Sequence, residues 1–420
     1  MSTHLLPRLS DYRFDRPSLS KDLVAGLTVA VVALPLALGF GITSGATAAA
    51  GLTTAVIAGF LAAIFGGSKY QVSGPTGAMT VILVPIIHHY GLTAIPFLGV
   101  LAGLIVILMA LLKLGAVINR VPWSVVEGFT VGIAFVIALQ QIPLALGVRK
   151  ADGDRSLIVA WRTVKNAISA GIHWQTLFVV ALTLLVKFLH PQIFRLLKIK
   201  VHIPASFVAI VTALVVVEVF SIKVATIGDI PRSLGNWKGG EVSFGDISHL
   251  LWPAFLIALL CAIESLLSAR VADGMVHTEA SERYEPNREL LGQGLATAAS
   301  SVFGGLPATG AIARTSVNVR AHARTRMASI FHATVLLFIA LVAAPWVSHI
   351  PAPAIAGVLI GTSYRILNPR SLRESLRTTK REAVVLIVTA VGTLAIDLIW
   401  GIAIGIVLYG VLALISPRTP

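Results

Sequence analysis

Apolar stretches long enough to cross a membrane recur along the whole of this chain. The first reads DLVAGLTVAVVALPLALGFGI, and comparable stretches follow it as far as residue 415. About 20 consecutive apolar residues span the hydrocarbon of a bilayer as a helix, whereas a membrane barrel shows short stretches of alternating hydrophobicity. Only 12% of the 420 residues are charged, against about 25% in a soluble domain. The chain therefore predicts an all-α integral membrane protein.

Seven spans are predicted in each half of the chain. In the first half, residues 22–220, they are 22–42, 46–65, 72–88, 92–113, 123–147, 174–196 and 204–220. In the second half, residues 248–415, they are 248–270, 287–303, 310–321, 326–348, 352–366, 381–397 and 399–415. The remaining segments are a polar N-terminal segment, 1–21, a connector rich in Gly, Pro and charge, 221–247, and the end, 416–420.

The net charge of +14 is interpreted through the excess of Lys and Arg in cytoplasmic loops rather than through nucleic-acid binding. With both termini in the cytoplasm of a bacterium, about 23 basic residues lie inside the inner membrane and about 8 outside. The connector is then extracellular. One segment departs from the rule, because the basic residues from Arg149 to Lys165 fall outside. Cys261 is the one cysteine, so no intramolecular disulfide can form.

Two similar polar interruptions occur, one in each half. QVSGPTGAMT covers residues 71–80, and LPATGAIART covers residues 306–315. Each follows a Gly-Leu-x-Thr-Ala and a Phe-Gly-Gly sequence, so the halves carry a weak internal repeat. Because an odd number of spans separates the two copies, they enter the membrane from opposite sides, as in inverted-repeat transporters. The alternative is a chance match among abundant Gly, Ala and Thr.

These interruptions predict an anion site. Pro75 and Pro307 stop each helix from extending backwards, and Thr76 and Thr309 are suited to be N-caps. Helix starts with free N–H groups attract anions, because the helix dipole adds to the unsatisfied donors. The amides expected to be free are those of Gly77, Ala78 and Met79, and of Gly310, Ala311 and Ile312. The alternative is that both breaks are packing kinks with a Gly for close helix approach.

Two charged residues are candidates for the same site. Glu264 lies in the middle of its predicted span, where an ionisable side chain is expensive and usually functional, and Ser268 lies one turn further on the same helix face. Arg314, four residues after Gly310, could add positive potential. The alternatives are a Glu264 that only ties helices together, and an Arg314 that belongs to a cytoplasmic cluster with Arg320, Arg324 and Arg326.

No catalytic triad, phosphate loop or carboxylate pair is visible in the sequence, and its histidines lack the spacing of metal ligands. We therefore predict no enzymatic activity, no structural metal and no cofactor. The exception is a coupling ion. A proton or Na⁺ bound at Glu264 would balance the charge that an arriving anion adds beside Arg314.

Three segments, DLVAGLTVAVVALPLALGFGITSG, VSGPTGAMTVIL and NRELLGQGLATAASSVFGGLPATGAIARTSVNVRAHARTR, closely resemble the sulfate permease (SulP) family, the prokaryotic relatives of the solute carrier 26 anion transporters. The resemblance implies fourteen spans in a seven-plus-seven inverted repeat. It implies a core domain (spans 1–4 and 8–11), a gate domain (spans 5–7 and 12–14), and an anion held at mid-membrane between the starts of half-helices 3 and 10. It also implies a homodimer.

The resemblance extends to single positions. It implies that Leu36 and Phe40 line the anion pocket with Thr76, Gly77 and Ala78. Relatives that transport bicarbonate bind Na⁺ through an acidic residue at the position of Glu264. In the same comparison Ser268 matches a hydroxyl ligand, Gly310 and Ala311 match backbone contributors, and Arg314 matches a chloride-binding arginine of some animal relatives.

Two positions depart from the pattern of the family. Many sulfate transporters have Gln in place of Leu36, and Ile312 replaces a hydroxyl residue near the Na⁺. Both departures favour proton coupling and a carboxylate-type anion. The family usually adds a cytoplasmic STAS domain after the last span, and we expect residues 416–420 to be a cytoplasmic end without one.

The sequence therefore predicts a secondary active transporter that imports a small carboxylate, bicarbonate or sulfate-like anion together with H⁺ or Na⁺. Three alternatives stay open: an uncoupled anion channel on the same scaffold, an exchanger, and the nucleobase transporter branch of this architecture.

Overall fold

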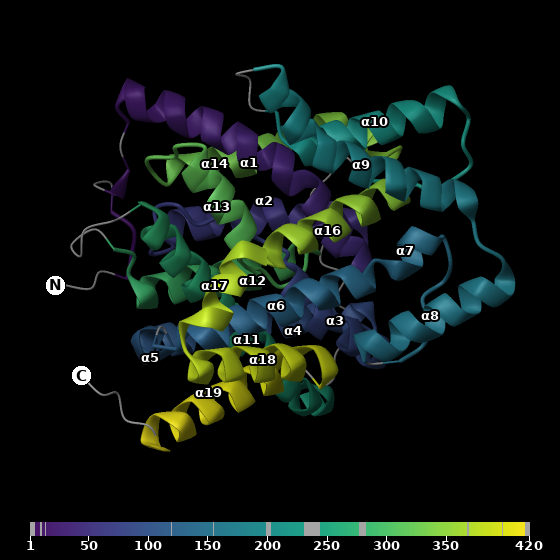
Figure 1. Cartoon of the computed structure of the whole chain (residues 1–420). Helices are drawn as coiled ribbons and strands as arrows, with labels where there is room; N and C mark the ends of the chain where they lie inside the picture. Colours follow the sequence, from purple (N-terminus) through teal and green to yellow (C-terminus); the bar gives the residue numbers. More distant parts are fainter. Residues whose placement is uncertain are drawn as a thin grey trace.

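The computed structural model describes residues 5–8, 11–12, 14–118, 120–153, 155–198, 203–230, 244–276, 283–367, 369–396 and 398–415. Nearly all of the described chain is helical (Figure 1). The predicted connector is described only at its two ends, since residues 231–243 lie outside the described ranges, as do 416–420. The prediction of an all-α protein is confirmed for the described part of the chain.

A helix occupies each predicted span. In the first half these are α1 (Arg16–Thr43), α2 (Ala48–Phe65), α3 (Gly77–Tyr90), α4 (Ile95–Leu111), α6 (Trp123–Gln140) continued by α7 (Ile142–Leu146), α9 (Trp174–Leu196) and α10 (Ala205–Val219). In the second half they are α11 (Phe244–Val276), α12 (Pro286–Val302), α13 (Ile312–Arg320), α14 (Met327–Phe338) with α15 (Ala344–Ser348), α16 (Ala352–Leu367), α18 (Lys380–Ala395) and α19 (Leu398–Ile415).

Seven helices of the described chain are long and apolar enough to cross a membrane, and three further apolar helices are shorter. The other four helices on predicted spans, α12, α13, α16 and α18, have at most 17 residues. The π-helical turn Ile339–Ala343 joins α14 to α15. The protein is thus a multi-span membrane protein with helices of unequal length.

Three helices were not predicted: α5 (Gly115–Ile118), α8 (Ser156–Ala170) and α17 (Pro369–Thr378). Helix α8 forms in the basic segment that was expected to be a loop. Its Val159, Ala160, Thr163 and Ala167 recur at helical spacing and are buried, which gives one apolar face. In the sequence, the basic residues of this segment stand between the four buried residues, so the helical spacing is not apparent. In the structure, these basic residues lie on the other, exposed face of the helix.

The helices pack in two groups. Helices α1 to α4 and α11 to α14 contact one another, with α4 on α12 and α1 on α14, and we call them the first helix group. Helices α6, α9, α10, α16, α18 and α19 form the second helix group, with α6 on α18 and α9 on α16. Within the first group α4 and α12 touch backbone to backbone, since a Cβ on Gly103 would lie 2.6 Å from the Gly294 carbonyl oxygen. Small residues permit such an approach between membrane helices.

The two short helices α3 and α13 begin inside the first helix group, next to each other. The residues before them form a two-stranded antiparallel sheet, β1 (Ser73–Gly74) and β2 (Thr309–Gly310), with Ser73 opposite Gly310 and Gly74 opposite Thr309. Backbone polar groups that leave a helix inside the membrane need partners. The strand pair supplies them to each other.

A buried carboxylate on α12 holds the segment that leads into β1. Glu289 is fully buried, and its Oε2 accepts hydrogen bonds from the backbone N–H groups of Gly67 and Ser68, both at 2.8 Å. Its Oε1 accepts from the side-chain amides of Gln71 at 2.7 Å and Gln293 at 2.9 Å. The Gln293 amide also donates to Ser73 Oγ at 2.6 Å. Both oxygens of Glu289 are therefore used for positioning β1.

Replacing Glu289 should destabilise the protein. Glu289→Gln places an amide N–H₂ against two donors, and a buried donor without a partner costs about 1–3 kcal/mol. We expect a lower melting temperature in detergent, measured by intrinsic fluorescence. The matched control is Glu374→Gln, since Glu374 lies exposed on α17. Equal melting temperatures for the two variants would contradict this role of Glu289.

Candidate functional site

The start of α3 agrees with the sequence prediction in its cap and in two of the three amides that were expected to be free, whereas the Met79 amide is engaged. Thr76 is its N-cap, and the Thr76 hydroxyl accepts a hydrogen bond from the Met79 N–H at 3.3 Å. Among the described residues the N–H groups of Gly77 and Ala78 have no acceptor. Two backbone donors at the first turn of α3 are therefore available to a ligand.

The start of the second short helix differs from the prediction. Helix α13 begins at Ile312 with Ala311 as its N-cap, so Thr309 is not a cap. The Gly310 N–H donates to Ser265 Oγ at 3.0 Å, and the Ala311 N–H donates to the Val72 carbonyl at 2.9 Å. Pairing with the segment of β1 thus extends to Ala311, and the Ser265 side chain takes the Gly310 amide, so both amides are engaged although they were expected to be free.

The free donors of α13 lie further along the chain. Within the described part of the chain, the backbone N–H groups of Ile312, Ala313 and Arg314 have no acceptor. Of the three amides predicted to be free in this half, Ile312 alone remains. The two helix starts still lie side by side, because β1 and β2 pair directly before them.

Glu264 of α11 joins the two helix starts. Its Oε2 accepts hydrogen bonds from the hydroxyls of Thr76 at 2.8 Å and Thr309 at 2.6 Å. The two hydroxyl oxygens are themselves 3.3 Å apart. Glu264 is 8% exposed, and its Oε1 has no hydrogen bond to a described residue. Glu264 therefore faces the protein interior, and one of its oxygens is unengaged by the described residues.

Arg314 lies in the same place rather than in a cytoplasmic cluster. It is 1% exposed, and its Nη2 donates to the Pro75 carbonyl oxygen at 2.7 Å, on the segment that enters α3. Its Nη1 has no partner among the described residues. An unpaired guanidinium N–H in a buried position is a strong donor for an anion.

Among the described residues, Ser268 makes its hydrogen bond with α13 and not with Glu264. It is fully buried, and its hydroxyl donates to Thr315 Oγ1 at 3.0 Å. The same Thr315 oxygen accepts the Val72 N–H at 3.1 Å. The sequence analysis missed the roles of Ser265 and Thr315, and Ser265 adjoins Glu264 in sequence, so its hydroxyl was a visible candidate.

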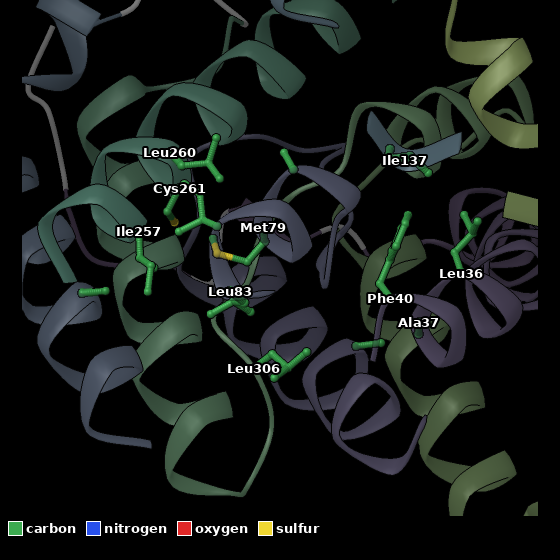
Figure 2. Close-up of a cluster of buried hydrophobic side chains, with 14 of the residues drawn as sticks. Leu36, Ala37, Phe40, Met79, Leu83, Ile137, Ile257, Leu260, Cys261 and Leu306 are labelled. Atoms are coloured by element: carbon green, nitrogen blue, oxygen red, sulfur yellow. The ribbon is translucent and has the colours of Figure 1, made fainter. Parts of the chain in front are cut away.

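Apolar side chains close one side of α3. Figure 2 shows Met79 and Leu83 of α3 near Cys261 and Ile257 of α11, while Phe40 and Ile137 lie apart from them, toward α1 and α6. A Cβ on Gly77 would lie 2.2 Å from Ile137 Cδ1 and 3.2 Å from Phe40 Cε1. Ile137 therefore packs directly on the first residue of α3. No sequence signal marked Ile137 among the other apolar residues of its helix.

Comparison of the sequence with protein-family models identifies the family of this chain. The model of the sulfate permease family matches residues 19–389. The chain belongs to the sulfate permease family. A putative sulfate transporter of Bacillus subtilis, YvdB, is 37% identical over 394 residues, which cover 92% of this chain and 72% of that protein. A bicarbonate transporter of Picosynechococcus, BicA, is 31% identical over 409 residues, which cover 94% of this chain and 70% of that protein.

Two solved structures share the fold of this sulfate permease family member. The transmembrane domain of a cyanobacterial bicarbonate transporter, BicA, matches with a TM-score of 0.83 and 30% identity, covering 93% of this chain and 99% of that chain. SLC26A9 matches with the same TM-score at 15% identity, covering 98% of this chain and 68% of that chain. The second match shows the fold alone. The family is one of transporters, so the prediction that the protein is not an enzyme is confirmed.

The β2 strand should not accept a side chain at Gly310. A Cβ there would lie 2.1 Å from Gln71 Nε2 and 2.5 Å from Gln71 Cδ, which would push that amide from Glu289 and from the Ser265 carbonyl. We expect Gly310→Ala to lower the melting temperature. The control is Gly274→Ala on α11, where a Cβ meets nothing within 4 Å and Ala favours the helix by about 1 kcal/mol. A Gly310→Ala protein as stable as Gly274→Ala would contradict the packing.

Proposed function

We propose that this protein is a secondary active transporter that moves a small anion across the bacterial inner membrane by alternating access. One observation carries the proposal: two helix starts with free amides lie beside an unpaired Arg314 Nη1 and are joined through the Glu264 carboxylate. The site offers several donors to a negative ligand and one carboxylate that can take up a cation.

The anion is held by both helix starts in this proposal. Gly77 and Ala78 donate from α3, and Ile312 donates from α13 together with the Arg314 side chain. Leu36 and Phe40 of α1 form the apolar wall of the pocket, as the family resemblance implies. Thr309 and Gly310 of β2 and Ala311, the N-cap of α13, hold the geometry rather than donating to the ligand, because their polar groups bond within the protein.

The proposed topology has fourteen spans in two inverted halves, 22–220 and 248–415, with both termini in the cytoplasm. The antiparallel pairing of β1 with β2 supports it, because equivalent segments related by a two-fold axis in the membrane plane run in opposite directions. Helices α3 and α13 then meet at mid-membrane. The first helix group corresponds to the core domain and the second to the gate domain. A homodimer stays a prediction from the resemblance.

Glu264 is the coupling residue in this mechanism. With Arg314 charged and Glu264 ionised, the two side chains balance, and an arriving anion leaves a net negative charge in a poorly solvated site. A proton on Glu264 restores the balance, so anion and proton bind together. H⁺ fits better than Na⁺, because the Ser268 hydroxyl is engaged with Thr315 and Ile312 offers no side-chain oxygen.

The substrate is a small oxyanion or carboxylate. Relatives of this chain are named as transporters of sulfate or of bicarbonate, and both ligands fit a site made of backbone amides and one guanidinium. The apolar Leu36, 4% exposed, offers no hydrogen bond to a doubly charged anion. That favours bicarbonate or a carboxylate over sulfate.

Transport into proteoliposomes tests the function as a whole. Sulfate, bicarbonate, chloride and C4 dicarboxylates are each supplied with an imposed proton gradient and, separately, with a Na⁺ gradient. Accumulation of one anion above its external concentration supports coupled transport. Passive equilibration with large currents would replace the proposal with an uncoupled channel, and obligatory counter-transport would replace it with an exchanger.

Replacing Glu264 should separate coupling from folding. Glu264→Gln keeps an oxygen that can accept both threonine hydroxyls but cannot gain or lose a proton. We expect gradient-driven accumulation to be lost while the protein stays monodisperse in detergent. The control is Glu218→Gln at the exposed end of α10, which should transport normally. Undiminished pH-driven uptake in Glu264→Gln would remove Glu264 from the mechanism.

Replacing Arg314 should weaken anion binding. Arg314→Met keeps the length of the side chain but loses the charge, and a hydrogen bond to a charged group contributes about 1.5–3 kcal/mol. We expect the dissociation constant, measured by isothermal titration calorimetry, to rise by about tenfold or more. Arg320→Met is the control, because Arg320 is exposed at the other end of α13. Arg314→Lys keeps the charge and should fall between wild type and Arg314→Met. Equal affinities for Arg314→Met and Arg320→Met would place the anion elsewhere.

A further inference from the structure

Helix α8 has an exposed apolar face in addition to its buried one. The buried face carries the four residues named above, and α8 packs on α6, α7 and α18. Leu157, Trp161 and Ile168 follow one another at spacings of four and seven residues, so they lie in line on another side of the helix. They are 49%, 71% and 67% exposed. We call these three residues the apolar stripe.

The remaining face of α8 is polar and basic. Arg162, Lys165 and Ser169 recur at spacings of three and four residues, and all three are exposed. Arg162 Nη1 donates to the Asp152 carbonyl oxygen at 3.3 Å, and the sequence of α8 contains no Asp or Glu. At 3.6 residues per turn, this face lies between the buried face and the apolar stripe. Helix α8 therefore has one protein-facing, one apolar and one cationic side.

The neighbouring spans place α8 at a membrane surface. It follows α7, which ends the span predicted at 123–147, and it precedes α9, which begins at Trp174. The three residues between Ala170 and Trp174 allow a separation of at most about 14 Å between these two positions. Figure 1 shows α8 at the edge of the molecule opposite the marked chain ends. In the proposed topology this edge lies at the outer surface of the membrane.

Two exposed tryptophans mark the same level. Trp161 of the apolar stripe and Trp174 at the start of α9 are 71% and 72% exposed. Tryptophan is enriched where the acyl chains of a membrane meet its headgroups, because the ring is apolar and its N–H is polar. A helix with Trp and aliphatic residues on one side and Lys or Arg on the next lies in the plane of this interface. The faces of α8 match that arrangement.

The charge of α8 indicates which lipids suit it. Long basic side chains reach from an apolar environment to the phosphates at the membrane surface. Two cations without a carboxylate on the same helix favour anionic headgroups over zwitterionic ones, because each basic residue near the surface adds electrostatic attraction. The lipid partner that fits this face is therefore an anionic phospholipid.

We propose that α8 is an interfacial helix that docks on the outer leaflet of the membrane, with the apolar stripe among the acyl chains and Arg162 and Lys165 on the phosphates of anionic phospholipids. The proposal adds a lipid partner and is independent of the transported anion. It also accounts for the one exception to the charge asymmetry of the loops, because these basic residues then have phosphates as partners. Since α8 packs on α6 and α18, the lipid contact anchors the second helix group.

Quenching of a fluorophore on α8 tests the docking in nanodiscs. Cys261, the one native cysteine, is fully buried, so the unmodified protein is the blank for labelling with the thiol-reactive dye NBD. Ile168→Cys puts the dye on the apolar stripe, and Ser169→Cys puts it on the polar face. Both positions are exposed. We expect a lipid with a nitroxide on its acyl chain to quench the dye at the first position, and aqueous iodide to quench it at the second.

Two results would overturn the docking. Quenching of both labels by iodide, with none by the nitroxide lipid, would place the apolar stripe in water. Protection of the Ile168→Cys label from both quenchers would indicate a protein contact, such as a second copy of this chain.

Nitroxide lipids with different headgroups test the basic residues. Acyl-labelled phosphatidylglycerol and phosphatidylcholine are added at equal fractions to nanodiscs that hold the labelled Ile168→Cys protein. We expect the anionic lipid to quench at least about fivefold more efficiently, which corresponds to about 1 kcal/mol for one basic residue at a membrane surface. Lys165→Gln in this protein should lower that preference by about the same factor.

Lys223→Gln is the matched control. Lys223 is also exposed and lies on the outer side in the proposed topology, but it lies outside α8. We expect this variant to keep the full preference for the anionic lipid. Equal quenching by the two lipids in the Ile168→Cys protein, or an equal loss of preference in Lys165→Gln and Lys223→Gln, would overturn the role of the basic residues.

Discussion

The bond between Glu264 and the two threonine hydroxyls is the interaction on which the centre of this protein depends. A helix that starts inside a membrane exposes donors that water cannot reach, and this chain contains two such starts. The strand pair satisfies the backbone before each start, and Glu264 ties the Thr76 and Thr309 side chains together. What remains unpaired at this site, within the part of the chain that the structure describes, is a short series of amides and one guanidinium N–H, all of which favour negative charge.

The two buried carboxylates, Glu289 and Glu264, differ in the number of hydrogen bonds that they accept. This number distinguishes the carboxylate that holds the structure from the one that can bind a further partner. Glu289 receives four hydrogen bonds, two on each oxygen, so it has no capacity for a further partner, and any change leaves donors without acceptors. Glu264 receives two, both on Oε2. Its second oxygen is open to a proton or a cation. The first carboxylate positions β1, and the second can change its charge without dismantling the sheet.

Much of the fold could be predicted from the sequence, because the hydrocarbon thickness sets the length of apolar helices and Pro and Gly mark where they break. The order of the helices follows from these features, whereas the meeting of Thr76, Glu264 and Arg314 was one of the alternatives that the residues left open. The two-residue shift at α13 could not be predicted, since it depends on pairing between strands more than 230 residues apart, which local capping signals do not report. Helix α8 and Ile137 were missed for a different reason. In α8, charged residues stand between the apolar residues and interrupt the visible helical spacing. Ile137 is distinguished from the other apolar residues of α6 only by its packing on Gly77.

Gly77 connects the proposed ligand site with the packing between the first and second helix groups. Its N–H is one of the free donors at the start of α3, and its missing side chain leaves the space that Ile137 fills. A larger residue would hold α6 away from α3, so the two helix groups could not pack here as they do while the donor kept its place. In the proposed function, the residue that receives the ligand is therefore also the residue against which the second helix group packs, so ligand binding and movement between the helix groups meet at a single position.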